Sequence, residues 1–368
     1  MTIPTSIMPN CMSDNESAFK AYYYLNQFRL NKIIIVTDNE NRAVGIITLG
    51  TFSKLKLNLR GYDSYSGFDG KTLSEICDRQ YLSIDAFEKD IYSAAAGIMA
   101  SYGVRSIPII DDSGIPVGII SEWQVFFRDW LLQKKFKAPD HRPHYAYLIW
   151  DSARIAKEKG YSEMSVIEFG VAAGTGLILA EKYAVEVERL TGIRIQVYGF
   201  DMETGLPELF ENDLVYYFQQ GDYPMDMAKL KNQLTTAKLI LGDIKDTGVS
   251  FFQKFCPPPI GTMFIDVDTY TATKSIFEML SESDDYFLPN VNMYFDDIAP
   301  EFMFEGEQLA IDEFNAININ MKIVQHNYSE VDKKICVTPS LRLKRLMRYK
   351  HPKYVEKRDY NRVLNLNV

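Results

Sequence analysis

The segment Val166-Ile-Glu-Phe-Gly-Val-Ala-Ala-Gly-Thr-Gly-Leu177 combines a short apolar strand, a turn with three glycines and the start of an alanine-rich helix. Gly170, Gly174 and Gly176 stand where the backbone turns tightly and where a side chain would keep a ligand away. The helix that follows directs its unpaired backbone N–H groups at the same place. The next apolar strand, Ile195–Asp201, ends in an acid that can accept both hydroxyl groups of a ribose. This part of the chain therefore predicts a nucleotide-binding strand, turn and helix in a parallel α/β sheet.

The spacing of the glycines distinguishes between two kinds of nucleotide site. The pattern here is G-x-x-x-G-x-G, whereas the dinucleotide fingerprint is G-x-G-x-x-G. The difference favours an adenosine ligand that carries no pyrophosphate. The same residues are also compatible with an ordinary strand, turn and helix that bind nothing.

Length, composition and charge limit the class of protein. The chain has 368 residues, enough for two domains, and its apolar fraction of 46% and charged fraction of 24% are ordinary for a soluble globular protein. The formal net charge of −9 argues against a nucleic-acid partner, which needs a basic surface. There is no apolar run long enough to span a membrane and no signal sequence at the N-terminus, so we expect a cytoplasmic protein without a membrane partner.

The four cysteines are scattered along the chain and lack the spacing of metal ligands. Neither a disulfide framework nor a cysteine zinc site is therefore predicted. We expect reduced, mostly buried thiols, as in other cytosolic proteins. The cysteines are Cys11, Cys77, Cys256 and Cys336.

A weak internal repeat covers the first part of the chain, to about Leu132. In each copy a helical stretch precedes a β-branched strand, an acidic turn and a second strand that ends in Thr or Ser. The strands are Lys32–Val36 and Ala43–Thr48 in the first copy, and Ser106–Ile110 and Pro116–Ser121 in the second. Because the turns carry hairpin residues, the repeat predicts two copies that pack their sheets together.

This repeat resembles a pair of CBS domains, with residues 1–132 forming copies at about 1–60 and 71–132. Its best motif is Gly103-Val-Arg-Ser-Ile-Pro-Ile-Ile-Asp-Asp112 followed by Val117-Gly-Ile-Ile-Ser121. The resemblance implies a small α+β pair that could bind an adenosine nucleotide and that associates into a homodimer or a larger oligomer. Such pairs contact the ribose with an aspartate shortly after the last Ser or Thr, but Gln124 occupies that position here. We therefore favour a structural or dimerising role for the pair over a ligand-sensing role.

A charged, proline-containing segment at residues 133–143 has the composition of a linker. Beyond it, apolar strands and helices alternate, which is typical of a doubly wound parallel sheet. We assign residues 144–340 to this second domain, with late strands near Met321–Gln325 and Lys334–Thr338. Residues 341–368 are locally basic, and we predict a C-terminal tail there.

Acids stand at the carboxyl ends of four successive strands of the second domain. Ligands of an open α/β sheet bind at this edge. A single acid at such a place is often only the cap of the next helix, but four in succession predict a binding site. The acids are Asp201, Asp243, Asp266 with Asp268, and Asp296 with Asp297.

The chemistry of these acids indicates a metal site. Asp266 and Asp268 are two residues apart, so they point to the same side of an extended strand, and Asp296 and Asp297 follow one strand later. Several carboxylates in one cleft repel each other unless a cation lies among them, and oxygen-only ligands suit Mg²⁺. Such an ion could hold two substrate hydroxyls while a spare carboxylate takes a proton. The alternative is a helix cap beside a solvated turn.

From about residue 143 to 340 the chain resembles the class I S-adenosylmethionine-dependent methyltransferases. Within that class it is similar to the metal-dependent sugar O-methyltransferases of the macrocin O-methyltransferase family. The resemblance implies a Rossmann-like, doubly wound α/β sheet. The matching motifs are Glu168-Phe-Gly-Val-Ala-Ala-Gly-Thr-Gly176, Tyr198-Gly-Phe-Asp201 with Gly205-Leu-Pro207, Asp266-Val-Asp-Thr-Tyr-Thr-Ala-Thr273, Tyr294-Phe-Asp-Asp297 and Gly306-Glu-Gln-Leu-Ala310.

The same resemblance implies roles for individual residues. Asp201 would contact the ribose of the cofactor, Asp243 would lie near its adenine, and Asp268 would be the general base. Val267 replaces the glycine that the family usually has between the paired acids. The metal ligands would be Asp266, Asp296 and Asp297, and the cofactor-binding residues Glu168, Gly170, Gly174, Gly176, Asp201, Gly242 and Asp243.

We predict an S-adenosylmethionine- and Mg²⁺-dependent O-methyltransferase that acts on a hydroxyl of a sugar, a sugar-like molecule or a nucleotide sugar. Its role would lie in glycan or natural-product biosynthesis. Direct attack of the acceptor oxygen on the methyl group forms no covalent enzyme intermediate, so no Ser, Cys or His nucleophile is required. One alternative is a glycosyltransferase that holds a metal and a nucleotide sugar with Asp266 and Asp268. Another is a non-catalytic sensor of an adenosine ligand.

Overall fold

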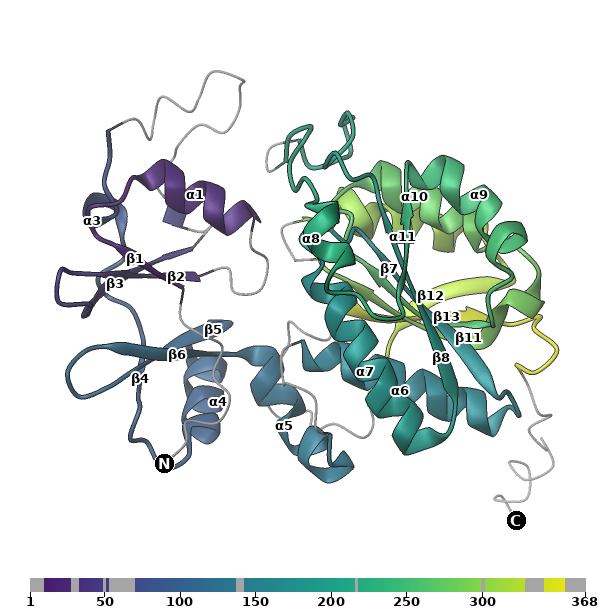
Figure 1. Cartoon of the computed structure of the whole chain (residues 1–368), viewed down its shortest axis with the longest axis horizontal. Helices are drawn as coiled ribbons and strands as arrows, with labels where there is room; N and C mark the ends of the chain where they lie inside the picture. The colour runs from purple at the N-terminus through teal and green to yellow at the C-terminus, as the bar shows by residue number, and fades with distance from the viewer. Residues whose placement is uncertain are drawn as a thin grey trace, which may run out of the picture. The chain divides into compact units, whose positions relative to one another are not determined.

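The computed structural model (Figure 1) divides the chain into two compact units. The described residues of the first end at Pro143, and those of the second begin at His144. Each unit has sheets and hydrophobic cores of its own. The structure describes residues 10–27, 33–48, 51–52, 70–136, 142–215, 218–298, 302–327 and 341–354.

The first unit contains two three-stranded sheets of the same design. In each sheet the first strand runs parallel to the second, and the third strand is antiparallel to the second. The internal repeat predicted from the sequence is therefore a repeat of structure. The strands are β1 (Cys11–Ser13), β2 (Ile33–Thr37) and β3 (Ala43–Thr48) in one sheet, and β4 (Ile84–Asp85), β5 (Ser106–Ile110) and β6 (Pro116–Ser121) in the other.

The two copies pack against each other through the faces of their sheets. Ile33 and Ile35 of the first copy form a small buried cluster with Ile119 of the second. The amide of Ala43 donates a hydrogen bond of 2.8 Å to the carbonyl oxygen of Gly114, which joins the edges of the two hairpins. The helices of this unit are α1 (Ala18–Gln27), α3 (Leu73–Ile76), α4 (Ile91–Tyr102) and α5 (Glu122–Lys134).

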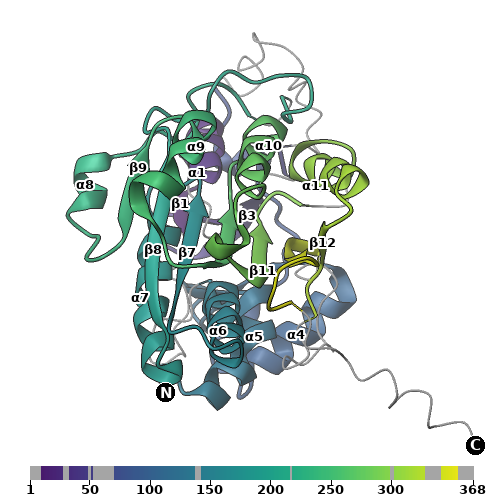
Figure 2. The same ribbon diagram turned by 90° about the vertical axis from the view of Figure 1, so that its right-hand side faces the viewer.

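The second unit is a seven-stranded sheet with helices on both faces (Figures 1 and 2). The strand order is β12-β13-β11-β10-β7-β8-β9. All neighbouring strands are parallel except β13, which runs antiparallel to both β11 and β12. The strands are β7 (Glu163–Phe169), β8 (Arg194–Asp201), β9 (Lys238–Leu241), β10 (Ile260–Ile265), β11 (Phe287–Phe295), β12 (Met321–Gln325) and β13 (Leu343–Arg348).

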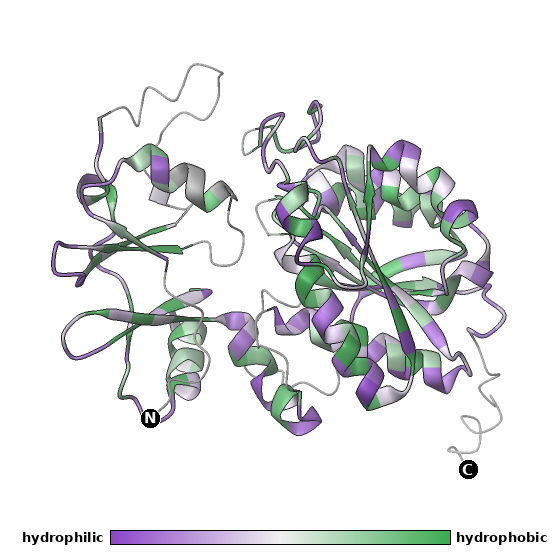
Figure 3. Ribbon diagram, viewed as in Figure 1, coloured by the Kyte–Doolittle hydropathy of each residue, from purple (hydrophilic) through white to green (hydrophobic). Residues whose placement is uncertain are grey.

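Helices α6 and α7 cover one face of this sheet, and α9, α10 and α11 cover the other (Figures 1 and 2). The central strands are apolar along their length because both of their faces are covered, as Figure 3 shows. Phe251, Ile276 and Ile311 bring one buried side chain from each of α9, α10 and α11 into the same core. The helices are α6 (Pro143–Glu158), α7 (Thr175–Thr191), α8 (Met227–Lys231), α9 (Ile244–Phe255), α10 (Tyr270–Met279) and α11 (Gly306–Ile317). The Rossmann-like α/β sheet, preceded by a smaller α+β pair, is thus the fold class predicted from the sequence.

The prediction of a basic tail at residues 341–368 is wrong for its first part. Leu343–Arg348 form β13, which lies between β11 and β12. A strand with several basic residues is stable there because Arg345 pairs with buried Asp151 and Arg348 pairs with Asp284. The other late strand predicted from the sequence, Lys334–Thr338, lies outside the described residues.

The expectation of mostly buried thiols is also wrong. Cys11 and Cys256 are exposed and Cys77 is half-buried, while Cys336 lies outside the described residues. Cys256 follows the last turn of α9 with a left-handed backbone (φ +41°), at a place where the chain turns on the surface. Among the described residues, no helix is both long enough and apolar enough to cross a membrane.

Candidate functional site

Three buried carboxylates meet where β10 and β11 end. Asp266 and Asp268 follow β10, and Asp297 follows β11 by two residues. One ligand oxygen of each of these three side chains lies within 4.8 Å of the others. The sequence predicted this meeting of acids at one edge of the sheet. Oxygen-only donors at such distances fit a hard divalent cation.

Glu307, in the first turn of α11, adds a fourth carboxylate to this region. Its side chain is fully buried, and Oε2 accepts a hydrogen bond of 3.0 Å from the backbone N–H of Asp297. Burial raises the pKa of Glu307 well above its ordinary value, and the negative charge of Asp297 raises it further. Oε1 of Glu307 and Oδ2 of Asp297 are buried and have no hydrogen-bond partner in the described chain. Buried carboxylate oxygens without donors favour the binding of a cation.

Asp296 has different neighbours from Asp297. Its Oδ1 accepts a hydrogen bond from the hydroxyl group of Tyr294 and lies 3.5 Å from Nη1 of Arg342. The carboxylates that approach one another within the described residues are those of Asp266, Asp268 and Asp297. Asp296 thus adjoins this group but faces other partners.

The backbone at the acid cluster is unusual. Asp268 has a φ of +62°, a left-handed conformation that non-glycine residues adopt rarely and that clusters at functional sites. Thr269 follows as the N-cap of α10, and its side chain accepts a hydrogen bond of 3.2 Å from the amide of Ala272. The left-handed residue thus stands at the turn between β10 and α10, beside the other acids of the group.

The glycine-rich turn after β7 is packed so closely that a side chain at either of two of its glycines would collide with neighbouring atoms. A Cβ on Gly170, whose φ is +82°, would lie 1.9 Å from the carbonyl oxygen of Asp266. A Cβ on Gly176 would lie 1.8 Å from Oε1 of Glu168. Glu168 is buried, and the same Oε1 accepts a hydrogen bond of 2.8 Å from the hydroxyl group of Tyr145. The turn and the acid cluster are thus in direct contact through the backbone of Asp266.

Gly174 begins α7 with a φ of +84°, and a Cβ there would lie 2.1 Å from the side chain of Leu230. Asp201, at the end of β8, connects its strand to the same turn. Its Oδ2 accepts a hydrogen bond of 2.8 Å from the amide of Ala172, and its Oδ1 accepts one of 2.8 Å from the amide of Glu203. Each oxygen keeps a lone pair for a further donor. This is the arrangement that a carboxylate needs to receive two ribose hydroxyls.

Gly242 and Asp243 lie at the end of the neighbouring strand, β9. Gly242 has a φ of +125° and donates its amide to the carbonyl oxygen of Asp201 at 2.9 Å. Asp243 is exposed and acts as the N-cap of α9, where it accepts a hydrogen bond of 2.9 Å from Lys245. Its role as a helix cap is sufficient to explain an acid at Asp243 without a ligand. Asp201 caps no helix, so its acid is not explained in this way.

In the first unit, Gln124 stands where a ribose-binding aspartate was expected. Its side chain is buried, and Oε1 accepts a hydrogen bond of 2.8 Å from the amide of Ser121. The hydroxyl group of Ser121 accepts one from the amide of Gln124 in return, which completes a capping box at the start of α5. Gln124 is therefore a helix-capping residue in this structure.

Comparison with known families identifies part of the first unit. Residues 74–128 match the model of the CBS domain family. The match covers the second copy, and the first copy repeats its strand order and strand directions, so the prediction of a CBS pair is confirmed. No curated protein sequence matches the chain.

Solved structures similar to parts of the chain include methyltransferases and CBS pairs. CalS11, a calicheamicin methyltransferase, is 16% identical, with 72% of this chain and 93% of that chain covered and a TM-score of 0.40. The O-methyltransferase NovP is 15% identical, with 55% and 78% covered and a TM-score of 0.38. CBSX2 in complex with AMP is 19% identical, with 37% and 98% covered and a TM-score of 0.29.

Two residues of the site were not assigned a role from the sequence. Glu307 belongs to a motif that carried the family resemblance, but its spacing gave no indication that its side chain reaches Asp297. Arg342 was placed in the predicted tail. Its approach to Asp296 depends on the insertion of β13 beside β11, and no local pattern indicates that pairing.

Proposed function

We propose that the second unit is an S-adenosylmethionine-dependent O-methyltransferase that requires a divalent cation, most simply Mg²⁺. The observation that carries the proposal is the contact between two parts of the sheet edge. A glycine-rich turn linked to Asp201 lies directly against the strand end that bears the buried carboxylates. A methyl donor held at the first part would present its methyl group to an acceptor hydroxyl held at the second.

The residues that would hold the adenosine-containing cofactor lie on three neighbouring strands. Glu168 and Gly170 belong to the end of β7 and its turn, and Gly174 and Gly176 to the start of α7. Asp201 would accept the ribose hydroxyls with the lone pairs that its two backbone hydrogen bonds leave over. For Gly242 and Asp243, next along the edge, we propose a position beside the adenine.

The carboxylates at the ends of β10 and β11 would hold the metal. Asp266 and Asp297 belong both to the set predicted from the sequence and to the group of three that lie close together. Bound Mg²⁺ would supply positive charge that lowers the pKa of the acceptor hydroxyl. Two neighbouring hydroxyl groups, as in a sugar or a sugar-like diol, are the ligands that such a site would accept best.

Asp268 would take the proton of the acceptor hydroxyl. As that proton moves to a carboxylate oxygen of Asp268, the acceptor oxygen forms a bond to the methyl carbon and the carbon–sulfur bond breaks. The electron pair of that bond stays on sulfur, so the positively charged sulfonium becomes a neutral thioether. The protein contributes alignment and a base, and it forms no covalent bond to the substrate.

For the CBS pair we propose a role in the association of subunits in preference to a role in ligand sensing. The side chain of Gln124 is engaged in a capping box, which leaves the predicted adenosine site without its usual acid. An adenosine nucleotide bound there would therefore rely on other contacts. A homodimer or larger oligomer remains the state that we expect.

Calorimetric titration of S-adenosylmethionine into the full-length protein, with and without Mg²⁺, tests the function. The matched variants are Asp201→Ala, Asp201→Asn and Asp285→Ala. Asp285 is an exposed acid before the amino end of β11, at the opposite edge of the sheet. We expect Asp201→Ala to weaken binding at least about tenfold, since each hydrogen bond to a carboxylate contributes about 1.5–3 kcal/mol. Asp201→Asn should lose less, and Asp285→Ala should bind like the wild type.

The alternatives predict different results in the same experiment. Binding that survives Asp201→Ala would indicate a site in the CBS pair and would favour a sensor. Absence of S-adenosylmethionine binding, together with binding of a UDP-sugar, would replace the methyltransferase by a glycosyltransferase. Binding that depends on Asp201 would direct the search to sugar acceptors, with methyl transfer as the readout.

A further inference from the structure

The two consecutive acids after β11 have different neighbours. A carboxylate oxygen of Asp297 lies within 4.8 Å of ligand oxygens of Asp266 and Asp268, and Oδ2 of Asp297 is buried without a hydrogen-bond partner among the described residues. Asp296 and Asp297 lie in the bend that follows β11, and Asp296 is not among the three described acids whose ligand oxygens approach one another. Among the described residues, Asp297 is therefore the member of the pair whose carboxylate joins the acids after β10.

Asp296 is held by two buried partners. Its Oδ1 accepts a hydrogen bond from Tyr294, and Nη1 of Arg342 lies 3.5 Å from the same oxygen. The side chains of Asp296 and Arg342 are 10% and 11% exposed, which limits the screening of this ion pair by water. The negative charge of Asp296 is thus compensated from within the chain.

Arg342 contacts the chain on both sides of Asp297. In addition to the ion pair with Asp296, its Nε donates a hydrogen bond of 3.3 Å to the carbonyl oxygen of Ile298. The amide of Asp297 itself donates to Oε2 of Glu307 at 3.0 Å. The backbone of Asp297 is therefore fixed from two directions, while its carboxylate is left for a ligand.

The position of Arg342 follows from the topology of the sheet. The last residue pair of the antiparallel ladder between β11 and β13 is Tyr294 with Leu343. Arg342 precedes that pair on one strand, and Asp296 follows it by two residues on the other. The inserted strand β13 thus delivers a guanidinium group, with its fixed fork of donors, to the end of β11.

We propose that Arg342 is a positioning residue of the metal site. It pairs with Asp296, which is itself supported by Tyr294, and so holds Asp297 as a cation ligand together with Asp266 and Asp268. In this assignment Asp268 takes the place of Asp296 in the ligand set predicted from the sequence. One carboxylate oxygen of Asp268 would face the cation, and the other would take the acceptor proton. The inference rests on the proposed function only in so far as that function requires a divalent cation.

Titration of Mn²⁺ into the full-length protein, followed by electron paramagnetic resonance, tests the assignment without any substrate. We expect the wild type to bind one ion, and Asp297→Asn and Asp268→Asn to weaken its binding by on the order of tenfold or more. Asp296→Asn should stay within about threefold of the wild type, because asparagine keeps the Oδ1 that accepts from Tyr294 and lies beside Arg342, and no ligand is lost. Arg342→Gln should weaken binding by about tenfold, as is typical when a residue that orients a ligand is lost.

Two further variants separate positioning from general stability. Arg342→Lys keeps the positive charge but loses the planar set of donors of the guanidinium group. Its Mn²⁺ affinity should therefore lie between those of Arg342→Gln and the wild type. Lys344→Gln removes a cation from the same strand, where Lys344 contacts Gln325, and it should leave the affinity unchanged. Thermal melts of the metal-free variants show whether any loss reflects unfolding.

Several outcomes would overturn the assignment. They are a tenfold loss in Asp296→Asn with little change in Asp268→Asn, Mn²⁺ binding in Arg342→Gln that equals the wild type, and absence of Mn²⁺ binding by the wild type. Titration of S-adenosylmethionine into the same preparations reports on the proposed function separately. The Mn²⁺ affinities of the variants could contradict the assignment while S-adenosylmethionine binding still depends on Asp201. That result would overturn this inference and leave the methyltransferase proposal in place.

Discussion

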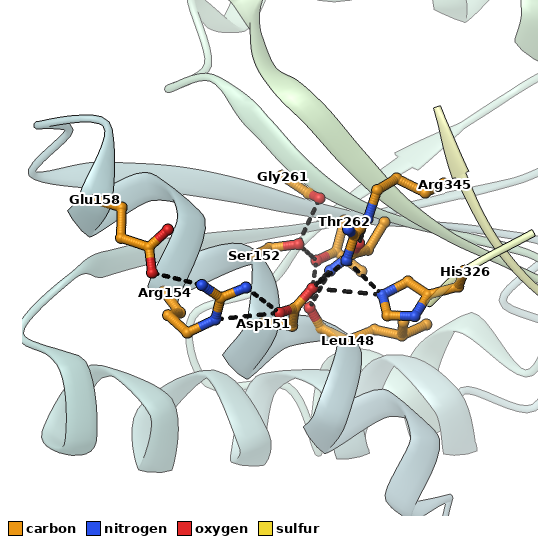
Figure 4. Close-up of polar contacts among 10 residues, drawn as sticks. Leu148, Asp151, Ser152, Arg154, Glu158, Gly261, Thr262, His326 and Arg345 are labelled. Carbon is orange, nitrogen blue, oxygen red and sulfur yellow. Dashed lines mark hydrogen bonds and ion pairs between the residues drawn. The ribbon is translucent and has the colours of Figure 1, made fainter. Parts of the chain in front are cut away.

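Two groups of buried charges in the second unit differ in the way that they are paired. On the face of the sheet covered by α6, each oxygen of Asp151 has a cationic donor, as Figure 4 shows. Nη2 of Arg154 lies 2.8 Å from Oδ1, and Nη2 of Arg345 lies 2.5 Å from Oδ2. Nδ2 of Asn292 donates a further hydrogen bond of 2.9 Å to Oδ2. At the carboxyl edge, by contrast, buried carboxylates face one another.

The contrast indicates which group serves the fold and which serves a ligand. Removing a charge from water costs several kcal/mol, so a buried charge is compatible with folding where partners compensate it and opposes folding where they do not. Around Asp151 the compensation comes from within the chain. At Asp297 and Glu307, buried oxygens without donors among the described residues remain, and a bound cation would compensate their charge. A local excess of charge that folding does not explain is a signature of function.

Polar groups beside Asp151 extend the paired cluster into the sheet. The hydroxyl group of Ser152 donates to the carbonyl oxygen of Gly261 at 2.6 Å, and that of Thr262 donates to Ser152 at 2.8 Å (Figure 4). Nε of Arg345 donates to Oδ1 of Asn292 at 2.9 Å. The cluster thereby ties α6 to β10, β11 and β13 with hydrogen bonds that are specific in direction.

The largest effect predicted by the comparison is the loss of stability in Asp151→Ala. The substitution leaves Arg345 partly buried without its carboxylate, and loss of one partner of a buried ion pair costs about 3–5 kcal/mol. Chemical denaturation should show this decrease in the free energy of unfolding. Glu158→Ala removes an exposed carboxylate that also pairs with Arg154, and it should change stability little. A decrease of similar size in both variants would mean that the burial of the Asp151 pair is not what matters.

The meeting of acids at the carboxyl edge of the sheet could be predicted from the sequence because the patterns that indicate it are local. A glycine-rich turn, an acid after an apolar strand and an i, i+2 pair such as Asp266 and Asp268 are each visible within a few residues. Parallel strands then bring their carboxyl ends to one edge without further information. The buried cluster has no such signal, since Asp151 and Arg345 are 194 residues apart in the sequence.

The same distinction explains the error at β13. The run Leu343-Lys-Arg-Leu-Met-Arg348 is basic, and isolated charges predict a solvated surface. Its cations become compatible with a central strand only through partners on α6 and before β11, which the sequence does not place nearby. Arg342 and its contact with Asp296 depend on the same insertion, so the sequence assigned neither of them its role at the site.

A second prediction is that neutralising an acid at the edge stabilises the metal-free protein. In Asp297→Asn the new amide group can donate to the neighbouring carboxylates, where two negative charges had repelled each other. We expect the free energy of unfolding without metal to rise by about 1 kcal/mol, as is common when a functional but unfavourable group is removed. Thermal melts with and without Mg²⁺ measure it.

The response to Mg²⁺ completes this test. The wild type should be stabilised by about 2.7 kcal/mol at a Mg²⁺ concentration of 100 times the dissociation constant, whereas Asp297→Asn should respond little at that concentration. The opposite pattern, with Asp297→Asn less stable than the wild type when both are free of metal, would show that Asp297 belongs to a paired structural cluster like that of Asp151.

The smallest effect concerns His326, which is buried beside the paired cluster. Its Nε2 lies 2.7 Å from Nη2 of Arg345 and 3.4 Å from Oδ2 of Asp151. Because a guanidinium only donates, the shorter contact favours an accepting Nε2 and a neutral ring. Burial lowers the pKa of His326, and the charge of Arg345 lowers it further, although Asp151 opposes the shift. In the unfolded chain the ring has an ordinary pKa of about 6.5.

The sign of the pH dependence follows from this difference. Below about pH 6.5 the unfolded state binds a proton that the folded state does not, so the free energy of unfolding falls as the pH is lowered. One such group contributes at most about 1.4 kcal/mol per pH unit. His351, whose pKa burial also lowers and whose Nδ1 accepts the amide of Lys353 at 2.9 Å, acts in the same direction. Denaturation between pH 7 and pH 5 should therefore show a slope that His326→Gln reduces and does not abolish. An unchanged slope in that variant would mean that His326 is charged in the folded protein and that its cluster is less completely paired than the distances indicate.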